Sequence, residues 1–381
     1  MKTKFGILIT FLLSIQLSGY AQVKHAVTFG NHSERIPTKE ENIYRIFMDM
    51  NGDYYPENKI SDEELKKSGQ SQLKIWAKKY PIQFGEIAKS YNLNNTIYSE
   101  ENYSILQDSI RSIITNQINN YRSQNLTWII HGFRKKTVKD ETDGFKVEYP
   151  NSNFENLECR NRITTYLLNK EMKTVFIEVY WDGKYLPRGG LLRTIKLGFL
   201  FKNHAIPNAI ECGYSLRKIL NKIECQKNNF ISHSTGTYVI SNLLFNLSPE
   251  YADIKTPHQM DIRIALTASA SPGKKLFKKY YNRNTELNYQ ETDNYSILNF
   301  INKNDFVLLK KRGFIKLPKL LGNTTLGCDY KSESKKLKEF FEMNFPNSTY
   351  SEAYNNYNGD HWFKSYTKSD GFEDVMYFLY K

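Results

Sequence analysis

Short apolar runs separated by longer segments of helical periodicity dominate the chain from residue 127 onward. The runs are too short for helices and are bounded by turn residues, which is typical of buried strands. Because such strands alternate with helical stretches, the pattern predicts an α/β fold, with a mostly parallel sheet and helices on both of its faces. We expect strands at 127–130, 174–180, 262–268 and 296–301, with a further strand ending near 232, and helices at 154–169, 208–223, 238–247 and 372–379.

The region before this alternation has a different pattern. Residues 43–55 surround an Asn-Gly pair, the strongest short signal for a β-hairpin. A helix is expected from the capping box at Ser61 to Pro81, and another from Ser99 to about Tyr121. Neither helix carries evident chemistry. We therefore expect an N-terminal hairpin-plus-helix extension, residues 22–122, packed on a main domain of residues 123–381.

The first 21 residues have the pattern of a secretory signal peptide. Two lysines precede a short apolar run at 5–17, and Gly19 and Ala21 suit cleavage before Gln22. No later segment of the sequence is long and apolar enough to span a bilayer. The sequence therefore predicts an exported protein, periplasmic or secreted, with no transmembrane segment after cleavage.

The charge and the cysteine content say little about which molecules the protein binds. The formal net charge is +13, which permits weak attraction to anionic surfaces. Nucleic acid is disfavoured by export and by the lack of a reader motif. The four cysteines match no zinc spacing, and their pairing stays open between three disulfide patterns and free thiols. The cysteines are Cys159, Cys212, Cys225 and Cys328. A disulfide between Cys212 and Cys225 is disfavoured, because both are expected on one helix, too far apart to pair.

Residues 230–237 carry the strongest chemical signal, reading Phe-Ile-Ser-His-Ser-Thr-Gly-Thr. An apolar run ends in Ser-x-Ser-x-Gly, and a helical pattern follows at once. This is the layout of a nucleophile elbow, a sharp strand-to-helix turn that exposes a serine hydroxyl, here that of Ser234. The amide of Thr235 would face developing negative charge. A small residue at Gly236 suits a turn in which backbone approaches backbone.

A serine nucleophile needs a base, and the base needs an orienting acid. The best candidate for the base is His361, on a turn-rich loop near the C-terminus, with His204 in reserve. The best candidate for the acid is Asp305, which follows a strand, whereas Asp293 precedes the same strand and would lie at the opposite edge of the sheet.

An oxyanion hole is also expected. His131-Gly132-Phe133 follows a predicted strand well before the elbow. The amide of Phe133 could form the hole together with that of Thr235. We expect His131 itself to tie down this loop.

The order Ser234, Asp305, His361, together with the earlier His-Gly-Phe element, resembles the α/β-hydrolase superfamily. The likeness covers about 127–381 and is nearest to little-characterised bacterial serine esterases with a tryptophan element, here at 180–183. Ser232 replaces the usual first elbow glycine. A lysine-rich insertion at 306–347 departs from the pattern, and we expect it to form a lid or cap.

The resemblance implies hydrolysis of an ester or related acyl bond in a small-molecule or lipid-like substrate, with no cofactor and no metal. The site residues would be Ser234, Asp305 and His361, with Phe133 and Thr235 as the oxyanion hole. Two alternatives stay open. One is a non-catalytic binding module for acidic glycan or envelope lipid. The other is an acyltransferase or peptidase that uses the same three residues, since the pocket decides which acceptor enters.

Overall fold

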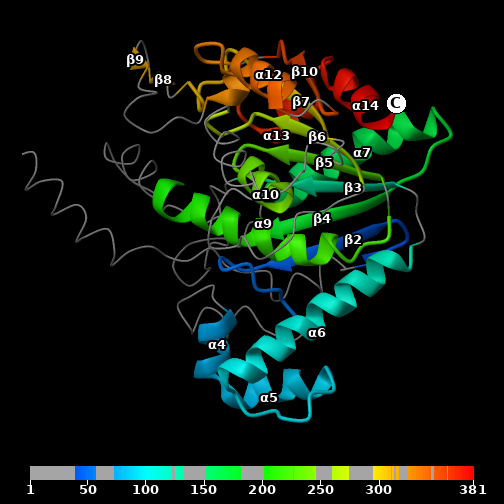
Figure 1. The fold of residues 1–381 in the computed structure, drawn as a ribbon, viewed down its shortest axis with the longest axis vertical. Helices are drawn as coiled ribbons and strands as arrows, with labels where there is room; N and C mark the ends of the chain where they lie inside the picture. Colours follow the sequence, from blue (N-terminus) through cyan, green and yellow to red (C-terminus); the bar gives the residue numbers. More distant parts are fainter. Residues whose placement is uncertain are drawn as a thin grey trace, which may run out of the picture.

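A central β-sheet with helices on both faces forms the body of the molecule (Figure 1). The computed structural model of the protein describes residues 39–56, 73–121, 125–132, 151–181, 201–225, 227–245, 260–273, 295–309, 311–312, 315–316, 325–344, 347–357 and 359–381. The predicted signal peptide at 1–21 lies outside these ranges.

The sheet has eight strands in the order β1-β2-β4-β3-β5-β6-β7-β10. The seven strands from β2 to β10 run parallel, and only the two-residue β1 is antiparallel to its neighbour. The mostly parallel α/β sheet predicted from the sequence is therefore confirmed. The bounds are β1 (Lys39–Glu40), β2 (Ile43–Met48), β3 (Asn125–Ile130), β4 (Val175–Trp181), β5 (Lys227–His233), β6 (Asp261–Thr267), β7 (Tyr295–Ile301) and β10 (Thr349–Tyr354), with a separate pair, β8 (Lys311–Arg312) and β9 (Ile315–Lys316).

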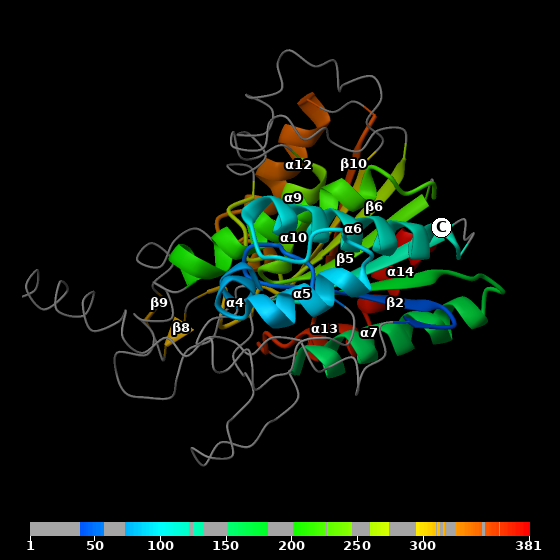
Figure 2. The same cartoon turned by 90° about the horizontal axis from the view of Figure 1, so that it is seen from below.

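Two helical layers cover the sheet because its buried strands are apolar on both faces. In β3, Trp128 and Ile130 belong to one buried cluster and Ile129 to the other. Figure 2 shows α7 and α13 on the side of the sheet opposite α9 and α10. The first layer is α9 (Ile206–Leu220), α10 (Gly236–Leu244) and α12 (Glu333–Asn344); the second is α7 (Asn151–Leu168), α13 (Phe363–Thr367) and α14 (Phe372–Tyr380). None of the helices among the described residues has both the length and the apolar character needed to cross a bilayer.

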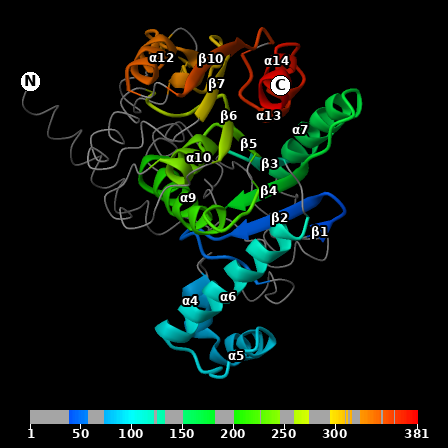
Figure 3. The same ribbon diagram turned by 45° about the vertical axis from the view of Figure 1, so that its right-hand side comes forward.

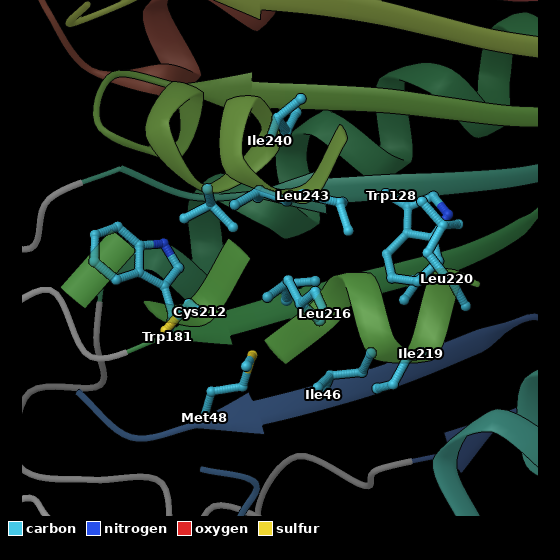
Figure 4. Close-up of a cluster of buried hydrophobic side chains, with 14 of the residues drawn as sticks. Ile46, Met48, Trp128, Trp181, Cys212, Leu216, Ile219, Leu220, Ile240 and Leu243 are labelled. Atoms are coloured by element: carbon cyan, nitrogen blue, oxygen red, sulfur yellow. The ribbon is translucent and has the colours of Figure 1, made fainter. Parts of the chain in front are cut away.

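Helix α9 packs closely against α10, the helix that follows the predicted elbow. In Figure 4, Leu216 and Ile219 of α9 lie toward β2, whereas Leu243 of α10 lies on the far side of α9 from that strand. Gly213 lets the helices approach, since a Cβ there would lie 2.5 Å from the carbonyl oxygen of Val239. The buried guanidinium of Arg217 donates to three carbonyls at the end of α10, those of Asn242, Leu243 and Phe245. Such bonds satisfy the last carbonyls of a helix, so Arg217 holds the C-terminal end of α10.

The N-terminal region only partly follows the prediction. The chain does reverse at Asn51-Gly52, with an isolated antiparallel bridge between Met48 and Tyr54. The first arm, however, is strand β2 of the central sheet and pairs in parallel with β4, so the prediction of a hairpin outside the main sheet is wrong. The Asn-Gly signal reported the reversal correctly and said nothing of the partner of the first arm, where Arg45 is buried beside Glu178 of β4 with Nε and Oε2 2.8 Å apart.

Three helices extend the fold beyond the β2 edge, at the end opposite β10 (Figure 3): α4 (Leu73–Lys79), α5 (Pro81–Ser90) and α6 (Glu100–Asn119). Ser99 caps α6 as predicted, its side chain accepting the amide of Asn102. A helix ends before Pro81 as expected, but a second helix, α5, which was not predicted, begins at Pro81, because proline suits the first helical turn. The expected helix start at Ser61 lies outside the described residues.

The C-terminal part of the predicted insertion at 306–347 belongs to the sheet layers. Helix α12 connects β7 to β10, and its apolar side, which includes Leu337 and Phe341, is buried in the core. Its lysines lie on the other side, where three of them pair with glutamates one turn away. This segment is therefore a crossover helix and not a lid. Strand β10, which the sequence did not predict, follows it as the edge strand beside β7.

All four cysteines are free thiols. Cys159, Cys212 and Cys328 are buried, and Cys225 is half-buried. Burial raises the pKa of the Cys159 thiol well above its usual range. The sequence left open whether the cysteines form disulfides or stay free, and in the structure they are free.

Candidate active site

The carboxyl ends of β3 and β5 mark the point where the strand order reverses. The chain leaves β3 through α7 to reach β4 on one side, and it leaves β5 through α10 to reach β6 on the other side. The helices α7 and α10 lie on opposite faces of the sheet. In open α/β sheets such a switch point leaves a crevice, because the two connections lead away from each other. Gly132, after β3, and Ser234, after β5, face each other there.

Ser234 occupies a sharp turn between β5 and α10. Its φ is +52°, a left-handed conformation that costs a non-glycine residue roughly 1–3 kcal/mol. Two backbone bonds to the β6 side hold the turn: the amide of Ser234 donates to the carbonyl of Thr267 at 3.0 Å, and the amide of Ala270 donates to the carbonyl of Ser234 at 3.2 Å. The neighbouring strand thus maintains the strained turn at Ser234.

Two glycines allow the end of β3 to pass against this turn. A Cβ on Gly236 would lie 2.7 Å from the carbonyl oxygen of Ile130, the close approach expected from the sequence. A Cβ on Gly132 would lie 2.8 Å from the Cβ of Ser234. Ser232, at the usual first glycine, is fully buried and accommodated in β5. The position of Ser234 therefore depends on small residues where the end of β3 meets the turn after β5.

His361 reaches the elbow from a loop between β10 and α13. Its Nε2 lies 2.9 Å from the Oγ of Ser234, and its Nδ1 lies 2.6 Å from the Oδ2 of Asp305. The three residues are distant in the chain, yet β5, β7 and β10 are parallel and end at one edge of the sheet. The structure thus brings Ser234, His361 and Asp305 into one continuous chain of hydrogen bonds.

Asp305 is fully buried and accepts four hydrogen bonds. Its Oδ1 accepts the amides of Val307 and Leu308, both at 3.0 Å, as an Asp-initiated turn does. Its Oδ2 accepts from His361 and from the Tyr366 hydroxyl at 2.8 Å. Burial and the charge of Asp305 raise the pKa of Tyr366 well above its usual range, so this hydroxyl keeps its proton and donates.

His131 connects the end of β3 to β4. Its Nε2 accepts the amide of Trp181 at 3.1 Å, and the indole of Trp181 donates to the carbonyl of His131 at 2.9 Å. The two rings stack with centroids 5.6 Å apart. Both side chains are fully buried, so the tryptophan noted in the sequence is part of the packing that holds this loop.

Not every predicted site residue can be placed. Thr235 follows Ser234 directly and precedes the first turn of α10. Phe133 and Asp293 lie outside the described residues. The reserve base His204 is on a short π-helix, η3 (Phe201–Ala205), whereas the imidazole bonded to Ser234 is that of His361.

Two residues close to this chain were not assigned to the site from the sequence. Tyr366 lies on the short helix α13 and its hydroxyl reaches Asp305, but a tyrosine in an apolar helix is most often simply core. His233, the residue before Ser234, packs on Phe363 and also contacts the backbone of His361. Only the loop that follows β10 brings these groups together, and that strand was not predicted.

No protein-family model, no curated protein and no solved structure matches this chain. The structure itself defines an α/β fold with a seven-stranded parallel sheet and interleaved helices. Within the described ranges, no three histidine, cysteine or acidic side chains gather as metal ligands would.

Proposed function

We propose that the protein is a serine hydrolase that cleaves an ester or related acyl bond through an acyl-enzyme. The observation that carries the proposal is the hydrogen-bonded chain from Ser234 through His361 to Asp305, which begins at a serine held with φ +52°. A buried carboxylate on one imidazole nitrogen and a serine hydroxyl on the other is the arrangement that activates serine.

In the proposed reaction the Oγ of Ser234 attacks the acyl carbon while Nε2 of His361 takes its proton. Asp305 holds the imidazole and stabilises the imidazolium that forms. The imidazolium then gives the proton to the leaving group, which departs and leaves an acyl-Ser234 ester. Water, deprotonated by His361, hydrolyses that ester and restores the serine.

The oxyanion formed in both steps needs donors that are already oriented. The amide of Thr235 is suited to this role because it directly precedes the first turn of α10, whose amides point out of the helix N-terminus. The second donor in the proposal is the amide of Phe133, which follows Gly132. Thr235 and Phe133 keep the roles expected of them from the sequence.

The substrate in this proposal is a small-molecule or lipid-like acyl compound, and the reaction needs no cofactor. Export to the periplasm or beyond is proposed from the leader pattern at 1–21. A transferase or peptidase would use the same residues with another acceptor or bond. A non-catalytic binding module would instead have no reason to make Ser234 selectively reactive.

The test is labelling of the folded protein with a fluorophosphonate probe, followed by peptide mass analysis. We expect one adduct, on Ser234, and none in Ser234→Ala with an unchanged circular dichroism spectrum. The matched control is Ser109→Ala on α6, whose hydroxyl bonds only its own helix at Ile105 and should not affect labelling. Labelling of another serine, or no labelling of the folded wild type, would refute the proposal.

A further inference from the structure

We infer that His233 is a positioning residue that fixes the loop bearing His361 directly to the elbow. This inference rests on the proposed function. The imidazole Nε2 of His233 lies 2.7 Å from the backbone carbonyl oxygen of His361. A carbonyl oxygen only accepts, so Nε2 of His233 carries the proton and donates it. The residue before the proposed nucleophile thus holds the backbone of the proposed base.

The His233 ring is itself held in one orientation. It is 5% exposed, and it stacks on Phe363 with centroids 5.1 Å apart and planes 11° apart. The ring of His361 lies against it, with centroids 5.0 Å apart at a tilt of 44°. On its other side, a Cβ placed on Gly132 would lie 3.0 Å from the Nδ1 of His233. A ring enclosed in this way donates in a fixed direction.

Two further bonds hold the flanks of the loop. The amide of Phe306 donates to the carbonyl of Gly359 at 3.0 Å, and the hydroxyl of Ser365 donates to Asp360 at 2.9 Å. The bond from His233 acts between these two flanks, on the backbone of His361, the proposed base. It therefore adds a constraint that the flanking bonds do not supply.

The consequence is a closed ring of contacts. It runs from the Oγ of Ser234 to the His361 imidazole, through the carbonyl of His361 to the His233 ring, and back through one peptide bond to Ser234. Because Ser234 and His233 are covalent neighbours, a shift of the elbow moves both ends of this ring together. The distance between Oγ and Nε2 is thereby kept, and a loss of about 1 Å in such alignment can cost roughly 10²-fold in rate.

The experiment compares His233→Phe, which keeps an aromatic ring against Phe363 but loses the donor, with His233→Gln, whose amide nitrogen can occupy the place of Nε2. The readouts are kcat and KM on p-nitrophenyl butyrate, the rate of fluorophosphonate labelling, and the thermal midpoint. We expect His233→Phe to lower kcat and the labelling rate by about 10²-fold with KM changed less than threefold. His233→Gln should recover at least tenfold of the lost kcat at a similar thermal midpoint.

Two results would overturn the inference: wild-type kcat in His233→Phe, or equal kcat losses in the Phe and Gln variants at equal stability, since packing alone would then explain the loss. If His233→Phe does not fold, His233→Leu replaces it as the variant without a donor and the same comparison with Gln decides. Absence of wild-type labelling at Ser234 would refute the proposed function itself, whereas normal wild-type labelling with an unaffected His233→Phe would refute only the role of His233.

Discussion

Two fully buried aspartates, Asp49 and Asp305, occupy similar turns at the same edge of the sheet. Asp49 follows β2 and Asp305 follows β7. In each, Oδ1 accepts two backbone amides from residues just ahead: those of Asn51 and Asp53 at 2.7 and 3.0 Å for Asp49, and two at 3.0 Å for Asp305. By burial and local turn geometry the two carboxyl groups are nearly equivalent.

The two aspartates differ in the partners of their second carboxyl oxygen, Oδ2. Oδ2 of Asp49 accepts the amide of Leu73 at 2.8 Å and so fastens the start of α4 to the turn. Oδ2 of Asp305 accepts from His361 and Tyr366. The comparison teaches that burial and turn bonds show where an acid is held, while the partner of its remaining oxygen determines whether it can orient a base.

The largest expected effect tests this contrast directly. Asp305→Asn should lower kcat by about 10⁴-fold, the loss typical when an orienting carboxylate becomes an amide. Asp49→Asn should leave kcat within about twofold, since its bonds serve only the scaffold. Both are measured as kcat on an activated ester, with fluorophosphonate labelling as a second readout. The reverse ranking would show that Asp305 is the structural acid.

A pair of glycines sharpens the contrast between site and scaffold. Gly132→Ala places a Cβ 2.8 Å from that of Ser234, and we expect a kcat loss of about 10²-fold as the serine is displaced. Gly85→Ala in α5 is the matched control, because its Cβ would lie 2.8 Å from the carbonyl oxygen of Thr96, away from the crevice. It should lower the thermal midpoint and leave kcat unchanged. Similar kcat in both variants would contradict the crevice geometry.

Tyr366→Phe probes the other donor to Oδ2 of Asp305. Hydrogen bonds to charged groups contribute about 1.5–3 kcal/mol, so we expect the free energy of unfolding to fall by that amount and kcat to fall by up to about tenfold. The control is Tyr350→Phe, whose buried hydroxyl bonds the neutral hydroxyl of Ser334 and should cost only about 1 kcal/mol. Denaturant titration measures both. Equal losses of stability would contradict a special contribution of the bond from Tyr366 to Asp305.

The smallest expected effect concerns the pH dependence of stability at Asp49. Burial, together with the charge of Asp53, raises the pKa of Asp49 well above its usual range, against the opposing effect of three amides. The contribution of Asp49 to the free energy of unfolding is therefore full below its pKa in the unfolded chain, about 3.9. It is lost as pH rises through the higher pKa of Asp49 in the folded protein. Denaturant titrations between pH 4 and 7.5 should show the stability of Asp49→Asn improving relative to wild type as pH rises. A constant difference would contradict the raised pKa.

Much of the fold could be read from local pattern. The apolar strands β3 to β7 stand between turn residues, and parallel strands end at one edge, so Ser234 and Asp305 could be brought together from the sequence alone. Strand β2 was misassigned because the Asn-Gly signal is local, whereas the strand pairs with β4, and its Arg45 with Glu178, 133 residues away. Strand β10 was missed because an edge strand is half-exposed and polar. The contacts of His233 and Tyr366 depend on the loop after that strand, so only the folded chain reveals them.

The proposed base, His361, lies on the loop after β10, which is an edge strand of the sheet. Strand β10 has β7 as its sole partner in the sheet order, whereas β5, which leads to Ser234, lies between two strands. Edge strands open at lower free energy than central ones. As the protein warms, β10 should therefore peel away and carry His361 with it while the central strands stay protected from hydrogen exchange. Heat would then end the proposed activity before it unfolds the protein, leaving a folded molecule in which Ser234 is intact but has lost its proposed base.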